Sequence, residues 1–372
     1  MTYTLIATEQ ELATICQSIS TEQYIAVDTE FKRETSYFPI PCLVQICTSS
    51  TTYCIDLLAI KELNALEMIF FNQHIVKVFH SGRQDLELFY CMFGRVPEPV
   101  FDTQIAAGLL GHDDQLGYAN LVKQELQVEL DKSQTRTDWE KRPFTKRQLD
   151  YAANDVIYLR KLYEKQVAQL QSLNRSTWCE EDCKQLTETS LYQPEVEDAW
   201  KKIKSFHRLT SSQQCIAYEI AKWRESEAIK RNKTRNYLLK NAALLELACK
   251  TPRSIDQLTN IADINKATIR RYGETLLEIL SHTSSMSEKD CPTAKNYFRL
   301  TDEQFTLLEQ LLNIVKEKST AIAINSCIIC SKKELEKIVR GKRDSNLFSG
   351  WRYQLAGKEI ETILQTKTTI NN

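Results

Sequence analysis

The stretch YIAVDTEFKRETSYFPIPCLVQICTSSTTYCID (residues 24–56) contains three runs of β-branched and aromatic residues that are separated by polar turns. The runs lie at 24–28, 42–48 and 52–56. Their short connections predict a hairpin or meander, and IVKVFH (75–80) indicates a further buried strand. Helical periodicity follows in five segments: 61–72, 83–93, 102–110, 117–126 and 146–170. Together these patterns predict an α/β domain over residues 1–170, with a mixed sheet flanked by helices.

Strand signals vanish beyond about residue 171. Residues 171–207 are polar and mostly aperiodic, which predicts a linker, and two helical blocks follow at 208–283 and 296–372. A Ser/Thr/Pro-rich segment at 281–296 divides the two blocks. Each block opens on Leu-Thr and continues into a long amphipathic helix. We therefore expect two small all-α bundles related as a degenerate repeat.

The composition excludes several classes of protein. Hydrophobic residues make up 42% and charged residues 26% of the chain, which rules out wholesale disorder. No apolar run approaches the ~18 residues of a membrane helix, and the N-terminus lacks the basic region of a secretory signal. No GxxxxGK[ST] motif occurs, so a helicase and a bound nucleotide cofactor are not expected. These features predict a cytoplasmic protein without a membrane partner.

Twelve cysteines are scattered from Cys16 to Cys330, many of them in apolar runs. In a chain of this length without a signal, this distribution predicts reduced thiols and not a disulfide scaffold. Cys327 and Cys330 form a CxxC pair, but no second CxxC follows. A structural zinc ion is not expected there, and the role of the pair stays open.

Acidic side chains occur where strands end and on a following helix. Asp28 and Glu30 are two residues apart on the first predicted strand, so both point to one face. Asp85 follows the strand at 75–80, and Asp155 lies one helical turn after Tyr151. Each position alone is unremarkable in a chain with 49 acidic residues.

Taken together, these five side chains predict a cluster of oxygen ligands. Clustered carboxylates repel one another unless a cation lies among them, and oxygen ligands suit Mg²⁺ or Mn²⁺. Two such ions can clamp the attacking and leaving oxygens of a phosphodiester displacement. The sequence therefore predicts a two-metal nuclease.

Five motifs in order resemble the ribonuclease D family of 3′→5′ exonucleases, which carry an Asp-Glu-Asp-Asp cluster with a Tyr. The motifs are AVDTEFKRETSYFPIPCLVQI (26–46), FHSGRQDLELF (79–89), VFDTQIAAGLL (100–110), DWEKRPFTKRQLDYAANDVIYL (138–159) and KTPRSIDQLTNI (250–261). The last motif resembles the helical HRDC domain, and the final block looks like a second, diverged copy. One departure is Phe144, where the family more often has Leu.

The resemblance implies a role for each acidic residue. Asp28, Glu30 and Asp155 would hold the first metal ion, and Asp28 would bridge to a second ion positioned by Asp85. Tyr151 would aim the attacking water, because a phenol with a pKa of ~10 is a poor base at neutral pH. The implied activity is hydrolysis of RNA from its 3′ end to nucleoside 5′-monophosphates, with tRNA precursors as the expected substrate.

Four further side chains are weaker candidates for contacts with nucleic acid. Trp139 and Arg142 could stack on a base and bind a phosphate, or they could belong to a helix entry with Asp138 as its cap. His80 and Gln104 could contact the terminal nucleotide, although core hydrogen bonds are the stronger interpretation. Asp102 is expected to cap a helix.

Basic residues concentrate in the first helical block, although the whole chain has a net charge of −1. Residues 209–282 contain 12 Lys and Arg against 8 Asp and Glu, a balance of +4. Within this block residues 222–240 carry seven Lys and Arg against two Glu, and this stretch includes the candidates Lys230, Arg231 and Lys233. Beside an acidic catalytic domain, this asymmetry favours binding of the RNA backbone.

Two alternatives remain at this stage. A 3′→5′ DNA exonuclease would use the same acidic cluster, and the contacts to the ribose 2′-hydroxyl that separate RNA from DNA cannot be located in the sequence. An inactive exonuclease fold that only binds RNA is disfavoured by the complete set of four acids and a Tyr.

Overall fold

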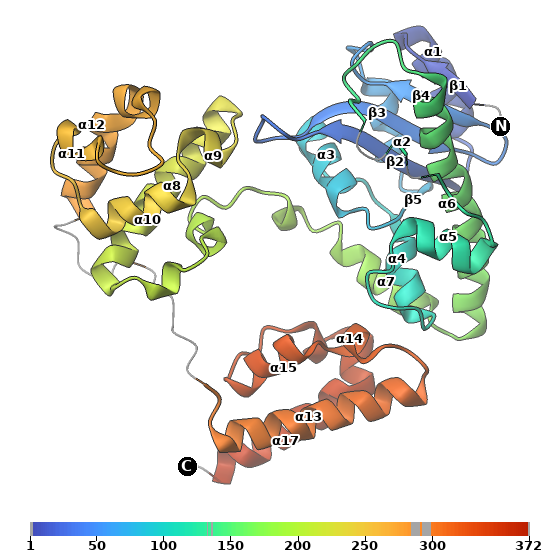
Figure 1. Cartoon of the computed structure of the whole chain (residues 1–372). Coiled ribbons are helices and arrows are strands. Elements are labelled where there is room, and N and C mark those ends of the chain that lie inside the picture. Colours follow the sequence, from blue (N-terminus) through green and yellow to red (C-terminus); the bar gives the residue numbers. More distant parts are fainter. Residues whose placement is uncertain (1–2, 132, 135–136, 284–290, 292–298, 371–372) are drawn as a thin grey trace. The chain divides into compact units, whose positions relative to one another are not determined.

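The computed structural model describes residues 3–131, 133–134, 137–283, 291 and 299–370. These residues form two compact units (Figure 1). The first unit contains residues 1–32, 41–192 and 300–372, and the second contains residues 33–40 and 193–299. The predicted boundary at residue 296 lies outside the described residues.

A six-stranded mixed sheet forms the centre of the first unit. Its strands are β1 (Tyr3–Ile6), β2 (Tyr24–Lys32), β3 (Ile40–Cys47), β4 (Thr52–Asp56), β5 (Val76–Phe79) and β6 (Val100–Asp102). They lie in the order β1-β4-β3-β2-β5-β6. β3 and β4 form the expected antiparallel hairpin, whereas β1–β4, β2–β5 and β5–β6 pair in parallel. The predicted fold class is therefore confirmed.

Helices cover both faces of this sheet. They are α1 (Glu9–Ile19), α2 (Asn64–Phe70), α3 (Arg83–Phe93), α4 (Thr103–Leu109), α5 (Tyr118–Leu126), α6 (Lys146–Ser172) and α7 (Ser176–Gln185). On one face, Val27 and Val44 pack with side chains of α1, α2 and α3. On the other, Ala26 and Val78 pack against Val156 of α6. Because β2 alternates between these two faces, the side chains next to Ala26 on its face point toward α6.

Within residues 1–170, three elements lie outside the sequence prediction, namely β1, α1 and the short strand β6. A local signal for α1 exists. Thr8 accepts a hydrogen bond from the backbone N–H of Glu11, and the Glu11 carboxylate accepts one from the backbone N–H of Thr8. This reciprocal pairing is a capping box, which the pattern T-x-x-E announces in the sequence.

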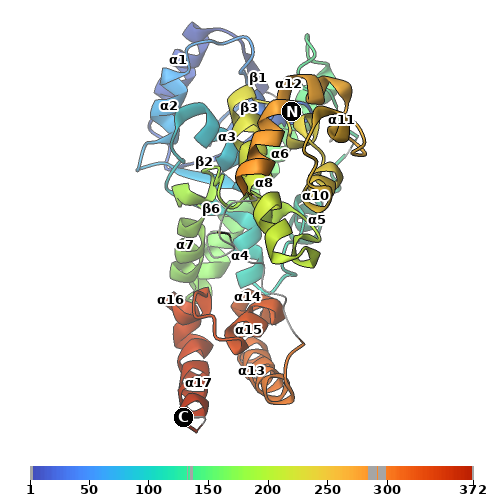
Figure 2. The same ribbon diagram turned by 90° about the vertical axis from the view of Figure 1, so that its left-hand side faces the viewer.

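The last helical block packs within the first unit. Its elements are α13 (Asp302–Ala321), α14 (Ser326–Ile329), α15 (Lys332–Val339), η5 (Asn346–Phe348), α16 (Gly350–Arg352), the π-helical η6 (Tyr353–Gly357) and α17 (Lys358–Ile370). Figure 2 shows α16 beside α7. The rings of Trp178 and Trp351 stack with centroids 4.6 Å apart, and the Arg352 guanidinium pairs with Asp182. α7 therefore joins the last block to the α/β fold.

This packing changes the interpretation of the predicted linker at 171–207. The segment contains α7 and three short 3₁₀ turns: η1 (Thr189–Leu191), η2 (Ala199–Lys202) and η3 (Phe206–Arg208). Cys179 and Cys183 are buried in the core shared with the last block. The polar sequence of α7 hid this role because its buried side chains make contact only in the tertiary structure.

The first helical block forms the second unit. Its helices are α8 (Ser211–Arg231), α9 (Arg235–Leu238), α10 (Asn241–Lys250), α11 (Ile255–Leu258) and α12 (Lys266–Thr283). Residues 33–40 belong to the same unit, where the Tyr37 hydroxyl donates to the buried Glu225 carboxylate at 2.6 Å. The long first helix of each block begins with a Thr–Gln capping box, at Thr210 and at Thr301. This agreement supports the repeat interpretation.

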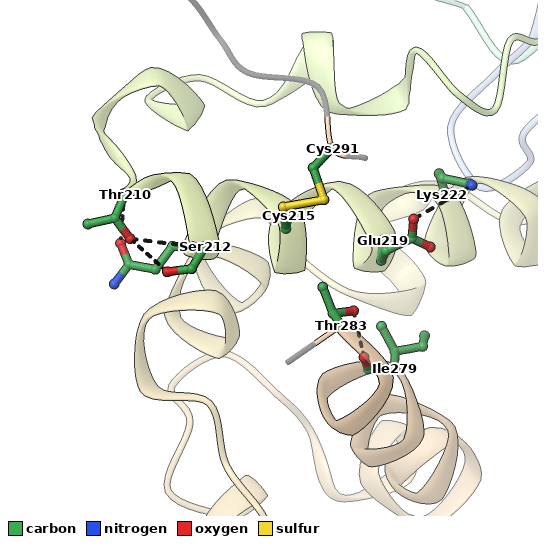
Figure 3. Close-up of a disulfide and its surroundings, with 9 residues drawn as sticks. Thr210, Ser212, Cys215, Glu219, Lys222, Ile279, Thr283 and Cys291 are labelled. Atoms are coloured by element: carbon green, nitrogen blue, oxygen red, sulfur yellow. Dashed lines mark hydrogen bonds and ion pairs between the residues drawn. A yellow bond between two sulfur atoms is a disulfide. The ribbon is translucent and has the colours of Figure 1, made fainter. Parts of the chain in front are cut away.

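One pair of cysteines departs from the prediction of reduced thiols. Cys215 on α8 forms a disulfide with Cys291 (Figure 3). The other ten cysteines are free, including Cys327 and Cys330. Nothing in the local sequence indicates this pairing, since the two residues are 76 positions apart. Among the described residues, none of the helices has the length and apolar character needed to cross a bilayer.

Candidate active site

Strand β2 carries the first two acidic side chains. It extends to Lys32, beyond the predicted end at residue 28, so Asp28 and Glu30 lie within the strand and not at its terminus. The two-residue period of the strand places both carboxylates on the face of Ala26, toward α6. Thr29 between them is buried.

Helix α6 contributes the third carboxylate. It begins after Thr145, whose hydroxyl accepts a hydrogen bond from the backbone N–H of Gln148. The N-cap of α6 is therefore Thr145, and the alternative prediction of Asp138 as the cap is wrong. Carboxylate oxygens of Asp28, Glu30 and Asp155 all lie within 4.8 Å of one another. The structure thus brings together three of the four predicted acids in a group that could hold a cation.

Asp85 lies next to this three-carboxylate group in the first turn of α3. It is 9% exposed, and its carboxylate accepts a 2.5 Å hydrogen bond from the Thr29 hydroxyl. Its charge contributes to raising the pKa of Glu30. Asp85 is therefore close enough to act electrostatically on the cluster, and Thr29 holds it in place.

Burial and mutual repulsion make the cluster costly to ionise. Burial raises the pKa of Asp28 to about 6. Burial, followed by the charges of Asp28, Asp155 and Asp85, raises the pKa of Glu30 to about 10. The pKa of Asp155 is also raised, first by burial and then by Asp28, while a hydrogen bond from Tyr151 opposes the shift. A bound cation would relieve this repulsion, and the oxygen-only donor set fits a hard divalent ion such as Mg²⁺ or Mn²⁺.

Comparisons with known proteins agree with this geometry. The model of a 3′-5′ exonuclease family matches residues 3–171, and the HRDC domain model matches residues 213–280. The ribonuclease D of Jannaschia sp. is 36% identical over 98% of this chain and 96% of its own length. This chain belongs to the ribonuclease D family. The resemblance drawn from the five motifs is confirmed.

Solved structures extend the match to the ribonuclease D fold. The crystal structure of Escherichia coli RNase D superimposes with a TM-score of 0.89 and 29% identity, and the match covers 98% of this chain and 99% of that chain. The catalytic core of RRP6 from Trypanosoma brucei gives a TM-score of 0.62 with 25% identity, covering 77% and 81% of the two chains. The family likeness therefore includes both the α/β domain and the helical region.

Two of the weaker candidates make hydrogen bonds within this ribonuclease D domain. The Gln104 amide donates to the backbone oxygen of Leu116 at 3.2 Å. His80 Nδ1 lies 3.0 Å from the Thr103 hydroxyl, and burial lowers the pKa of the imidazole. Asp102 caps α4 by accepting from the backbone N–H of Gln104 at 2.8 Å. These contacts favour the core interpretation of both side chains.

Arg142 is committed to contacts inside the protein. Its guanidinium makes two 2.6 Å hydrogen bonds to the Asp56 carboxylate, and it also donates to the backbone oxygens of Trp139 and Cys42. Trp139 is 4% exposed and packs near Tyr151 with ring centroids 6.3 Å apart. A buried indole and an occupied guanidinium favour the structural interpretation of the segment before α6, not contact with a base or phosphate.

The basic candidates of the first helical block border a recess on its surface. Arg231 and Lys233 line a cavity of about 940 Å³ together with Tyr237, Arg270 and Arg271. The Tyr237 side chain is 66% exposed. Lys230 lies next to Arg231 on the exposed end of α8. The sequence prediction of binding residues missed Arg270 and Arg271, although the run Arg-Arg-Tyr at 270–272 was a visible signal.

Several neighbouring bases have a structural role instead. Arg235 pairs with the buried Glu225, and Lys240 pairs with Asp263 at 2.7 Å. Arg224 is buried and donates to the backbone oxygen of Leu239 at 2.8 Å. The net charge of residues 222–240 therefore overstates the charge available to a ligand.

Proposed function

We propose that this exoribonuclease of the ribonuclease D family binds two divalent ions, Mg²⁺ or Mn²⁺, at its acidic cluster. Asp28, Glu30 and Asp155 would hold one ion, and Asp28 and Asp85 would place the second. The observation that carries the proposal is the approach of three partly buried carboxylates to within 4.8 Å of one another. Such ions, when bound, would lower the pKa of the attacking water and neutralise charge on the phosphate.

Tyr151 has a positioning role in this proposal. Its hydroxyl donates to Asp155 in the structure, so the phenol already points toward the reacting centre. A free phenol with a pKa of ~10 is largely protonated at neutral pH. Tyr151 therefore orients the attacking water through a hydrogen bond and does not remove its proton. Water attacks the terminal phosphorus, the bond to the 3′ oxygen breaks, and a nucleoside 5′-monophosphate leaves the shortened chain.

We further propose that the first helical block binds RNA. Four cations line its recess, of which Arg231 also pairs with Glu227 on α8, and no acidic side chain is among the described lining residues. Lys230, Arg231 and Lys233 would contact phosphates with Arg270 and Arg271, while the exposed Tyr237 offers a ring for stacking. The structure of E. coli RNase D is described as that of an exoribonuclease involved in structured RNA processing. By analogy, we propose tRNA precursors as substrates and the cytoplasm as the site of action.

A digestion experiment tests the proposed function. A 3′-tailed RNA and the equivalent DNA would be incubated with the full chain in Mg²⁺, in Mn²⁺ and in EDTA. We expect release of nucleoside 5′-monophosphates from RNA with either metal and none in EDTA. No release from either polymer with either metal would contradict the proposal and favour an inactive RNA-binding protein. Preferential digestion of the DNA would favour the DNA exonuclease alternative.

A further inference from the structure

A pocket of about 480 Å³ opens beside the proposed catalytic residues. One wall is a face of α6 that carries Arg147, Tyr151, Asn154 and Asp155, and the opposite wall is formed by residues 130, 131 and 133. Two of these four α6 residues belong to the proposed active site. The pocket therefore adjoins the position proposed for the terminal phosphate of the substrate.

Asn154 has an unmet hydrogen-bonding requirement in this pocket. Its Oδ1 is buried and has no hydrogen-bond partner among the described residues. A buried polar atom without a partner is costly, and such atoms are rare in folded proteins. Because Asn154 is also one of the residues that line the pocket, its carbonyl oxygen is available as an acceptor for a ligand bound there.

Two of the other polar side chains in the pocket already have partners. The Asp150 carboxylate accepts from Lys146 Nζ at 2.6 Å. The Asp131 carboxylate accepts from the backbone and the hydroxyl of Ser133, both at 2.8 Å. Arg147 is exposed and carries a positive charge, which suits a phosphate. Asn154 is neutral, and its buried carbonyl oxygen can accept a hydrogen bond from an uncharged donor such as a hydroxyl.

We infer that Asn154 accepts a hydrogen bond from the 2′-hydroxyl of a ribose at the 3′ end of the substrate and so separates RNA from DNA. The inference rests on the proposed exonuclease function. A ribose 2′-hydroxyl both donates and accepts, and a rotated Asn amide can meet either role. DNA has no such group, so a deoxyribose would leave Oδ1 unpaired. The pocket supplies the contact with the sugar that the sequence could not locate.

The test compares one RNA oligonucleotide with two copies that carry a single 2′-deoxynucleotide, at the last or the second-last position. In the wild-type protein with Mg²⁺, we expect one substitution to lower kcat/KM about 10-fold, the effect of one hydrogen bond to a buried group. In Asn154→Ala, kcat/KM on the all-ribose strand should fall to about the value for the deoxy strand. The variant should lose little activity on the deoxy strand itself.

Arg147→Gln is the matched control on the same helix face. Loss of a phosphate contact should lower kcat/KM on ribose and deoxyribose strands by the same factor and leave their ratio unchanged. The inference would be overturned if Asn154→Ala lost activity by the same factor on both strands, because the ratio of kcat/KM between the ribose and the deoxyribose strand would then be unchanged. A ratio that depended on the base and not on the sugar would also overturn it. A wild-type protein that is inactive on every strand would instead refute the proposed function. Activity without sugar preference at either position refutes the inference alone.

Discussion

The acidic cluster and the basic recess both gather charges of one sign, but they differ in burial. Burial of Asp28 and Glu30 raises their pKa values, so ionisation without a cation is unfavourable. In the recess, Arg270, Arg271 and Lys233 are exposed, and water screens their repulsion. The acidic cluster therefore favours a small cation that can enter among its carboxylates. The exposed group suits an extended polyanion that approaches from solution.

The largest effect is expected when one charge is removed from the acidic cluster. Asp155→Asn should lower kcat at least ~10³-fold, because a ligand charge is lost where the transition state needs a metal ion. The measurement is the rate of nucleotide release at saturating Mg²⁺. Glu164→Gln, on the same helix but in an exposed ion pair with Arg160, should retain activity. Near-normal turnover of Asp155→Asn would refute the two-metal interpretation.

Tyr151→Phe tests whether the Tyr151 hydroxyl, beside the acidic cluster, orients the attacking water or helps to bind the metal ion. We expect kcat to fall ~10²–10⁴-fold, the range for a group that positions a proton during its transfer. The concentration of Mg²⁺ that gives half-maximal activity should hardly change, since the hydroxyl is not a proposed ligand. A large loss of Mg²⁺ affinity would show that Tyr151 helps to form the ion site.

Neutralising the recess should weaken binding and leave the chemistry intact. In Arg270→Gln/Arg271→Gln, we expect KM for a tRNA precursor to rise about 10-fold and the salt slope of binding to fall by ~0.7 for each lost contact. kcat on a short single strand should stay within about twofold, since no recess residue belongs to the acidic cluster. Lys250→Gln, which removes an exposed base paired with Glu246 in the same unit, is the control. If the dependence of binding on salt were the same in the double variant and in this control, the recess would not be an RNA-binding surface.

The smallest expected effect is on the free energy of unfolding of the metal-free protein, which should depend on pH. The folded-state pKa of Asp28 is raised to about 6 from 3.8, so the folded protein binds more protons than the unfolded chain between these values. The free energy of unfolding in EDTA should therefore fall as pH rises through about 6. Asp28→Asn should flatten this decline and be more stable at pH 8 by on the order of 1–3 kcal/mol.

The difference between Asp28→Asn and wild type is the quantity to measure, by thermal unfolding in EDTA at pH 5 and pH 8. Taking the difference removes other buried groups such as Lys77, whose pKa burial lowers to about 7. Saturating Mg²⁺ should abolish or reverse the advantage of the variant, because the ion binds the ionised folded form. An equal decline in both proteins would show that Asp28 does not titrate as the structure implies.

The sequence by itself determined the fold class and singled out Asp28, Glu30 and Asp155, the three acids that the structure brings together. Strand and helix periods are local properties, and the spacing of Tyr151 and Asp155 fixes their common helix face. The family motifs added the order in which the acids occur. The length of β2 was underestimated because polar residues such as Thr29 and Glu30 continue a strand that only its neighbours stabilise.

Only the tertiary structure decided which polar and basic side chains are available to a ligand. The sequence does not distinguish Arg142 and Arg235 from Arg147 and Arg270. In the structure, Arg142 forms an ion pair with Asp56, and Arg235 forms one with Glu225. The role of α7 was also decided by the tertiary structure, because its polar sequence gives no indication that Trp178 packs on Trp351. The physical reason is that partners distant in the chain settle the hydrogen bonds of a charged side chain. Local spacing carries no record of those partners.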